Sequence, residues 1–260
     1  MREVTREGTR EGAALLRLRA GQLRAGTQCL VRELRLDLEP GQRWALIGRN
    51  GAGKSTLLRL LAGLGEPGDA SLELAGEPLR TLSPARLARL RGYMPALPHD
   101  RFGISVLDAL MLGQREPDEP HALHWLQAVD ALELARRSLL RLSSGERQRV
   151  ALAQALAQEA AWLLLDEPVS FQDPRHQASL ARLLREHVEP GGPRALVFSA
   201  HDLNWVAAVA THVLALLPDG AWTAGEASQI LCEPTLRRAY DCAWQRIERP
   251  GRGALWIAGD

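Results

Sequence analysis

The chain contains a single lysine, which lies in the glycine-rich stretch "GRNGAGKS" at residues 48–55. This stretch fits the pattern G-x-x-x-x-G-K-[ST], in which glycines let backbone N–H groups curl around a phosphate without Cβ clashes. Lys54 would bring a compact ammonium group to the terminal phosphates of a nucleotide, whereas a planar arginine would be too bulky there. Ser55 could bind Mg²⁺ through its hydroxyl group.

A chance glycine turn is the less favoured interpretation of this stretch. The apolar run "RWALIG" precedes it and the helical pattern "STLLRLLAGL" follows it, so a helix N-terminus would face the same phosphates. We therefore expect nucleotide contacts from nine consecutive residues: Gly48, Arg49, Asn50, Gly51, Ala52, Gly53, Lys54, Ser55 and Thr56.

A pair of acidic residues ends the apolar run "WLLLDEP". Ligands of parallel sheets bind at the carboxyl ends of the strands, where Asp166 could bind Mg²⁺ and Glu167 could polarise an attacking water. Two solvated acids at a strand end would be the structural alternative. His201 follows another apolar run, "ALVFSA", and would share this edge, where it could contact the terminal phosphate.

The segment "LSSGERQRV" at residues 142–150 supports two interpretations. Ser143 and Glu146 have the spacing of a capping box, which would be a purely structural start to a helix. A serine hydroxyl beside a helix N-terminus could also form a second phosphate-binding surface.

The elements that must position these residues alternate between strands and helices. Apolar runs at 43–48, 161–168 and 194–202 are typical of strands buried on both faces, whereas residues 14–38 alternate as half-buried strands do. Residues 71–79 resemble a small hairpin. Helical periodicity dominates from about residue 85 to residue 158, and residues 1–13 resemble a solvated tail. The expected class is α/β, with a parallel sheet interrupted by a helical block.

Composition excludes several kinds of function. A net charge of +1 among 260 residues argues against a nucleic-acid partner. The three cysteines have no metal-ligand spacing, so we expect a reducing compartment. The longest apolar run has the six residues "AAWLLL", and a membrane-spanning helix needs about 20. Any membrane role is therefore expected to depend on a partner chain.

Taken together, the motifs resemble those of the ATP-binding cassette (ABC) ATPases over nearly the whole chain. The order is a phosphate loop at 48–55, "LSSGE" at 142–146, "LLLDEP" at 163–168, "SFQD" at 170–173 and then His201. The resemblance implies one domain over residues 14–260. It would have a P-loop NTPase (RecA-like) core, an antiparallel β subdomain and a helical subdomain at about 85–158.

The resemblance also implies how the sites would be used. In that family two cassettes form a head-to-tail dimer, and each ATP lies between the phosphate loop of one and the serine-glycine signature of the other. By match, Ser143 and Gly145 would contact the γ-phosphate across the dimer. Asp173 would link the two sites, and His201 would be the switch histidine.

The last third, from "HDLN" to "LRRAYD", resembles ATPases of importers for iron-siderophores, haem and cobalamin. This implies separate transmembrane permease subunits, an indirectly associated substrate-binding protein and a peripheral position on the cytoplasmic face of the membrane. Coupling would use the surface near residues 96–115. A soluble non-transport ABC ATPase acting on DNA or the ribosome is an alternative.

Four departures from the family pattern raise a second alternative, a nucleotide-binding module that hydrolyses ATP weakly. Ala96 replaces the usual glutamine after "YxP", and Ser144 replaces the first glycine of the signature. "SFQD" replaces "SALD". Residues 23–25 lack the aromatic side chain that stacks on adenine.

Overall fold

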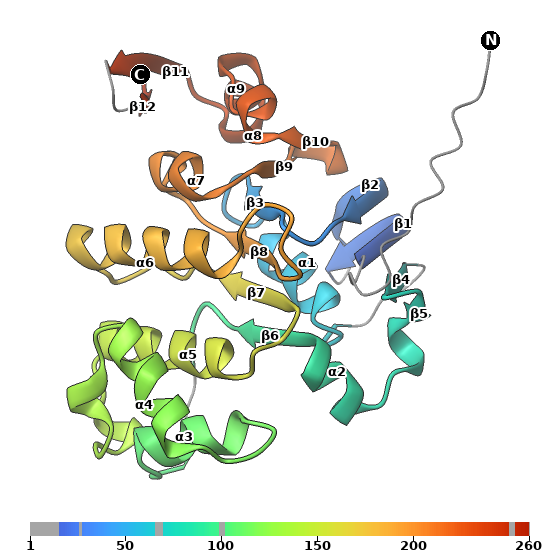
Figure 1. Cartoon of the computed structure of the whole chain (residues 1–260). Coiled ribbons are helices and arrows are strands. Elements are labelled where there is room, and N and C mark those ends of the chain that lie inside the picture. Colours follow the sequence, from blue (N-terminus) through green and yellow to red (C-terminus); the bar gives the residue numbers. More distant parts are fainter. Residues whose placement is uncertain (1–15, 26–27, 66–69, 99–101, 250–252, 260) are drawn as a thin grey trace.

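The computed structural model describes residues 16–25, 28–65, 70–98, 102–249 and 253–259, so the predicted tail at 1–13 lies outside the described residues. A six-stranded sheet in the order β10-β9-β3-β8-β7-β6 forms the core (Figure 1). Five neighbouring strands run parallel, and only β10 at the edge is antiparallel. The strands are β3 (Arg43–Ile47), β6 (Arg91–Met94), β7 (Trp162–Asp166), β8 (Ala195–Ser199), β9 (His212–Leu216) and β10 (Trp222–Glu226).

The central strands are apolar on both faces because both faces are covered. Every residue of β3, β7 and β8 is buried. On one face lie α1 (Lys54–Leu61) and an antiparallel sheet in the order β2-β1-β4-β5. Its strands are β1 (Leu16–Ala25), β2 (Gln28–Leu38), β4 (Ser71–Leu74) and β5 (Glu77–Pro78). The half-buried strands and the small hairpin predicted from the sequence are confirmed.

Helices cover the other face of the core sheet. They include α6 (Pro174–His187), α7 (Leu203–Val209), α8 (Ala227–Ile230) and α9 (Glu233–Tyr240). The 3-10 turn η4 (Pro218–Gly220) joins β9 to β10, and a hairpin of β11 (Trp244–Arg249) and β12 (Gly253–Ala258) packs against α7 and α9.

Three helices of the predicted helical block pack on one another beyond the β6 edge of the sheet: α3 (Val106–Gly113), α4 (Glu119–Ala128) and α5 (Ser144–Ala157) (Figure 1). Short 3-10 turns lie at η1 (Leu79–Thr81), η2 (Leu132–Leu134) and η3 (Leu139–Arg141). The helical periodicity predicted over about 85–158 is interrupted after Ala128, and Asp130 then adopts a left-handed φ of 56°.

One part of the helical block is a strand. Helix α2 (Pro84–Leu90) ends at Leu90, and Arg91–Met94, which lie within the predicted helical block, form β6 and pair with β7. Its Gly92 lies so close to α5 that a Cβ atom there would come within 2.7 Å of the Ala155 carbonyl oxygen. The predicted α/β class, with a P-loop core, an antiparallel β part and a helical part, is confirmed. The described helices include none that is both long and apolar enough to cross a membrane.

Candidate functional site

The phosphate loop, residues 48–55, joins the carboxyl end of β3 to the start of α1. Gly53, the N-cap of α1, has a φ of 101°, and Gly48 has a φ of 141°. A Cβ atom at Gly53 would come within 2.8 Å of Leu30, and one at Gly48 within 2.7 Å of the Leu216 carbonyl oxygen. Both backbone angle and space therefore require glycine at these two positions. Ser55 and Thr56 follow in the first turn of α1.

Lys54 is only 6% exposed, and its ammonium group donates to two carbonyl oxygens of the loop itself. The distances from Nζ are 2.9 Å to Gly48 and 3.1 Å to Arg49. Burial lowers the pKa of Lys54, and the nearby carboxylates of Glu167 and Asp166 raise it in part. The Lys54 ammonium group is therefore close enough to Asp166 and Glu167, at the end of β7, to interact with their charges.

The acidic pair is fixed by Ser199, the last residue of β8. Its hydroxyl donates to Asp166 Oδ1 at 2.6 Å and accepts from the Glu167 backbone N–H at 2.9 Å. The buried Asp166 ends β7, which pairs with β8 in parallel register. This arrangement satisfies a buried carboxylate and fixes the direction of the chain that leaves the strand.

Glu167 has a left-handed φ of 50° and turns its side chain toward two partners. Ser170 donates its hydroxyl to Oε2 at 3.0 Å, and His201 Nε2 lies 2.6 Å from Oε1, a hydrogen-bond distance. His201 is exposed and follows β8. The structure therefore brings Lys54, Asp166, Glu167 and His201 to one edge of the sheet, as predicted.

The donor atoms at this edge suit a small hard cation. Asp166 offers a carboxylate and Ser55 a hydroxyl, which are oxygen ligands of the kind that Mg²⁺ takes together with phosphates and water. Among the described residues, no group of three or more His, Cys, Asp or Glu side chains could hold a metal by itself.

Ser143 and Gly145 lie in a second group at the start of α5. The predicted capping box is present, since the Ser143 hydroxyl accepts from the Glu146 N–H and Glu146 accepts from the Ser143 N–H. The backbone N–H of Ser143 lowers the pKa of Glu146 and keeps it charged. Gly145 packs closely on the next segment, because a Cβ atom there would lie 3.0 Å from the Phe171 carbonyl oxygen.

Two glutamines join this second group to the acidic pair. Gln148 of α5 donates to the Glu167 carbonyl oxygen at 2.7 Å, and Gln172 donates to the Gly145 carbonyl oxygen at 3.0 Å. Asp173 caps α6 by accepting from the His176 N–H at 3.0 Å. The start of α5, the acidic pair and the start of α6 therefore form one connected unit.

A further contact reaches the phosphate loop from the C-terminal part of the chain. The Gly48 N–H donates to the hydroxyl oxygen of Tyr240 in α9 at 3.3 Å, and Arg49 lies 3.5 Å from the Asp241 carboxylate. Burial raises the pKa of Tyr240 to about 12, so the hydroxyl stays neutral. Roles for Ser199, Gln148 and Tyr240 at the site were not predicted from the sequence, and of these three only Ser199, two residues before His201, lies near a predicted site residue.

The structure also shows the location and burial of the residues that depart from the family pattern. Ala96 is half-buried just after β6, and Ser144 is exposed as the first residue of α5. Leu23 of β1 is buried, and Arg24 beside it is exposed. Phe171, in the "SFQD" segment, is exposed with a left-handed φ of 62°.

Comparison with known proteins agrees with this geometry. The ABC transporter family description matches residues 31–170. The chain is 36% identical to a hemin import ATP-binding protein, HmuV, of Bordetella avium over 83% of this chain and 87% of that protein. It is 34% identical to a protein of the same description from Ruegeria sp., over 90% of this chain and 94% of that one.

Solved structures show the same fold. A chain described as a metal-chelate type ABC transporter in an inward-facing conformation aligns with a TM-score of 0.76 and 26% identity, over 95% of this chain and 98% of that one. A bacterial ABC exporter with ATP bound aligns with a TM-score of 0.73 at 22% identity, over 85% of this chain and 40% of that one. The chain belongs to the ABC transporter family, as one of its ATPases.

Proposed function

We propose that this chain hydrolyses ATP with Mg²⁺ to drive an importer. The observation that carries the proposal is the convergence of Lys54, Asp166, Glu167 and His201 at the carboxyl edge of β3, β7 and β8. In this proposal the backbone of residues 48–56 and the Lys54 ammonium group bind the phosphates. Asp166 and Ser55 bind Mg²⁺, which supplies neutralisation of phosphate charge.

Glu167 and His201 act on the attacking water and the terminal phosphate in this proposal. Glu167 orients and polarises the water, and His201 contacts the γ-phosphate. His201 Nε2 lies 2.6 Å from Glu167 Oε1, so a water held by Glu167 would also be close to His201. This closeness supports a common role for the two side chains. The intact set of four residues argues against the weakly hydrolysing module despite Ala96 and Ser144.

Each active site would be completed by a second copy of the chain. We propose a head-to-tail homodimer in which Ser143 and Gly145 of one copy contact the ATP bound by the other, with Asp173 between the sites. The exposed position of Ser143 and Asp173 supports this arrangement. Within one copy, Gln148 of α5 donates to the Glu167 carbonyl oxygen, and Gln172, which precedes Asp173, donates to the Gly145 carbonyl oxygen of the signature.

The membrane partner would be a pair of permease subunits, with a substrate-binding protein associated through them. Large apolar side chains are exposed on the segment predicted to couple: Leu97 is 59% exposed, Phe102 73% and Leu112 76%. Such exposed apolar side chains, gathered on one segment, support a surface for a protein partner. The proposed position is the cytoplasmic face of the membrane.

The similarity to hemin import ATP-binding proteins favours haem as the imported substrate, within the wider group of metal chelates. A soluble ABC ATPase acting on DNA or the ribosome is not favoured, because no basic surface for nucleic acid is expected at a net charge of +1.

The test is to reconstitute the chain with the permease encoded beside it in proteoliposomes. ATP turnover and ATP-dependent uptake of haem, ferric siderophore and cobalamin are then measured together. Glu167→Gln is expected to lower turnover by about 100-fold or more and to stop uptake, because the water loses its base. The exposed Glu189→Gln is the charge-matched control.

Turnover by Glu167→Gln at the wild-type rate would refute the catalytic assignment. A wild-type rate no higher than that of Glu167→Gln would identify a weakly hydrolysing module instead. Uptake of cobalamin or siderophore without haem would correct the substrate and leave the importer assignment intact.

A further inference from the structure

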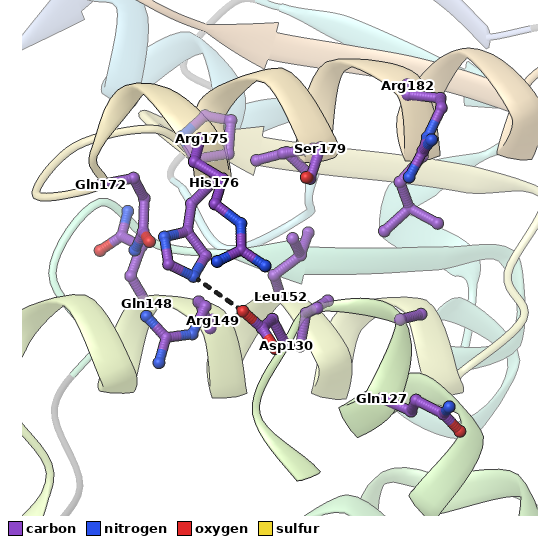
Figure 2. Close-up of a pocket in the computed structure, with 15 residues that line it drawn as sticks. Gln127, Asp130, Gln148, Arg149, Leu152, Gln172, Arg175, His176, Ser179 and Arg182 are labelled. Carbon is purple, nitrogen blue, oxygen red and sulfur yellow. Dashed lines mark hydrogen bonds and ion pairs between the residues drawn. The ribbon is translucent and has the colours of Figure 1, made fainter.

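A cavity of about 200 Å³ lies between the helical part of the molecule and helix α6 of the core. Its walls come from the end of α4, one face of α5, and α6, as Figure 2 shows. Gln148 and Gln172, which connect the start of α5 to the acidic pair, form part of its wall. The cavity is distinct from the phosphate loop, whose residues do not line it.

The cavity is strongly basic. Arg149 comes from α5, and Arg175 and Arg182 come from α6, facing the end of α4 and the side of α5 (Figure 2). Asp130 is the one carboxylate among the residues that line the cavity, and its Oδ2 lies 3.2 Å from His176 Nε2. Three guanidinium groups therefore face a cavity whose single acid already has a partner.

Among the described residues, acidic side chains balance the charge of these three guanidinium groups only in part. Glu146, the acid whose charge Arg149 influences, is paired with Arg137 at 2.8 Å. The Nε atom of Arg149 is fully buried and lacks a hydrogen-bond partner among the described residues. A buried charged donor left without an acceptor is costly, and an anion beside the guanidinium group would offset part of that cost through its charge.

Spacing and size narrow the class of anion. Arg175, Ser179 and Arg182 occupy positions i, i+4 and i+7 of α6, so they share one face and extend over about 10 Å. The arginines come from two facing helices, and a phosphate group, with more acceptor oxygens than a carboxylate, can accept hydrogen bonds from both helices at once. We propose that this cavity binds a small phosphorylated molecule with two anionic groups, of the size of a diphosphate.

Such a ligand would connect two parts of the molecule that carry different functional elements. Arg149 lies in α5, which begins at the signature residues, whereas Arg175 and Arg182 lie in α6, which begins beside Asp173. A diphosphate bonded to both helices would fix their relative position. The ligand would therefore stabilise one arrangement of the signature relative to the core.

The test uses inorganic pyrophosphate as the probe, in Mg²⁺-free buffer, with the full chain carrying Lys54→Ala so that binding at the phosphate loop is removed. Isothermal titration calorimetry is expected to show one pyrophosphate per chain. Inorganic phosphate is expected to bind about tenfold or more weakly, because it reaches fewer of the arginines. Added Arg175→Ala or Arg149→Ala is expected to weaken pyrophosphate binding by about tenfold or more.

Arg185→Ala is the matched control, since it removes the same charge from α6 outside the cavity, and it is expected to leave binding unchanged. Hydrogen exchange is the second readout, and pyrophosphate should slow exchange in both α5 and α6. The proposal is overturned if pyrophosphate does not bind to the Lys54→Ala chain. It is equally overturned if Arg149→Ala and Arg175→Ala bind as well as Arg185→Ala does, or if exchange slows in neither helix.

Discussion

Lys54 shows at the scale of one residue why the chain keeps lysine where it otherwise uses arginine. The ammonium group fits between the Gly48 and Arg49 carbonyl oxygens and is almost fully buried. A point charge with three donors can exchange these carbonyl partners for phosphate oxygens without displacing the loop. A guanidinium group, which is wider and planar, cannot enter the same space.

Lys54→Arg is therefore expected to lose ATP affinity almost as completely as Lys54→Ala. We expect both substitutions to raise the dissociation constant for ATP by about 100-fold, because the charge-assisted contacts to the phosphates are lost. Calorimetry with Mg²⁺-free ATP measures this directly. Wild-type affinity in Lys54→Arg would show that charge alone, and not its shape, determines the residue at this position.

Some residues of the site could be predicted from their immediate sequence neighbours, and others could not. Lys54, Asp166, Glu167 and His201 could be predicted, because each lies next to an apolar run whose carboxyl end faces the same edge. Ser199 and Gln148 could not be assigned a role in advance. Their partners lie 33 and 19 residues away, and only the folded sheet brings those atoms together.

Helices and strands could be predicted where a short stretch of sequence shows a clear pattern. The buried strands and the capped start of α5 follow from apolar runs and from the Ser143–Glu146 spacing. Strand β6 was missed because four residues directly after a helix give no separate periodicity, and its strand character comes from pairing with β7. Contacts with the rest of the fold therefore determine that residues 91–94 form a strand.

One ring contact between α4 and α6 involves a histidine whose neutral form is favoured by partial burial. The His187 ring lies edge-on against Trp125, with 5.4 Å between ring centroids. Burial, with a smaller contribution from Arg194, lowers the pKa of His187 to about 4. The unfolded chain binds this proton near pH 6.5, so acid favours unfolding.

The free energy of unfolding should therefore fall as pH is lowered from about 6.5 toward 4, by at most about 1.4 kcal/mol per pH unit from this group. His187→Gln cannot titrate and is expected to lose about 1–2 kcal/mol less than the wild type between pH 7 and pH 5. Urea unfolding at the two pH values measures the difference. Equal losses in both proteins would contradict a buried neutral His187.

At the scale of the whole molecule, the sheet order explains why distant segments meet. Strand β8 lies between β3 and β7, so the phosphate loop, His201 and the acidic pair follow three neighbouring strands. The signature residues belong to a different part of the molecule, beside α6. In a head-to-tail dimer, the phosphate loop of one copy would face the signature residues of the other. Each copy would therefore contribute one half to each of two sites.

Mixing two defective chains tests that dimer. In a Glu167→Gln background, Lys54→Ala should not bind ATP, and Ser143→Arg should bind ATP but not retain it through gel filtration. Mixed dimers contain one intact pair of halves, so about one ATP per mixed dimer should be retained. The control is each variant alone, which should retain none. Mixed dimers that retain no ATP would contradict the head-to-tail arrangement.

The hydrogen bond between Gly48 and Tyr240 joins residues 192 positions apart in the sequence. A chain emerging from the ribosome makes its phosphate loop early, since synthesis and folding proceed from the N-terminus. The loop nevertheless gains this partner only after α9 has been synthesised and has docked. The phosphate loop thus reaches its final set of contacts only after residue 240 has left the ribosome and α9 has docked.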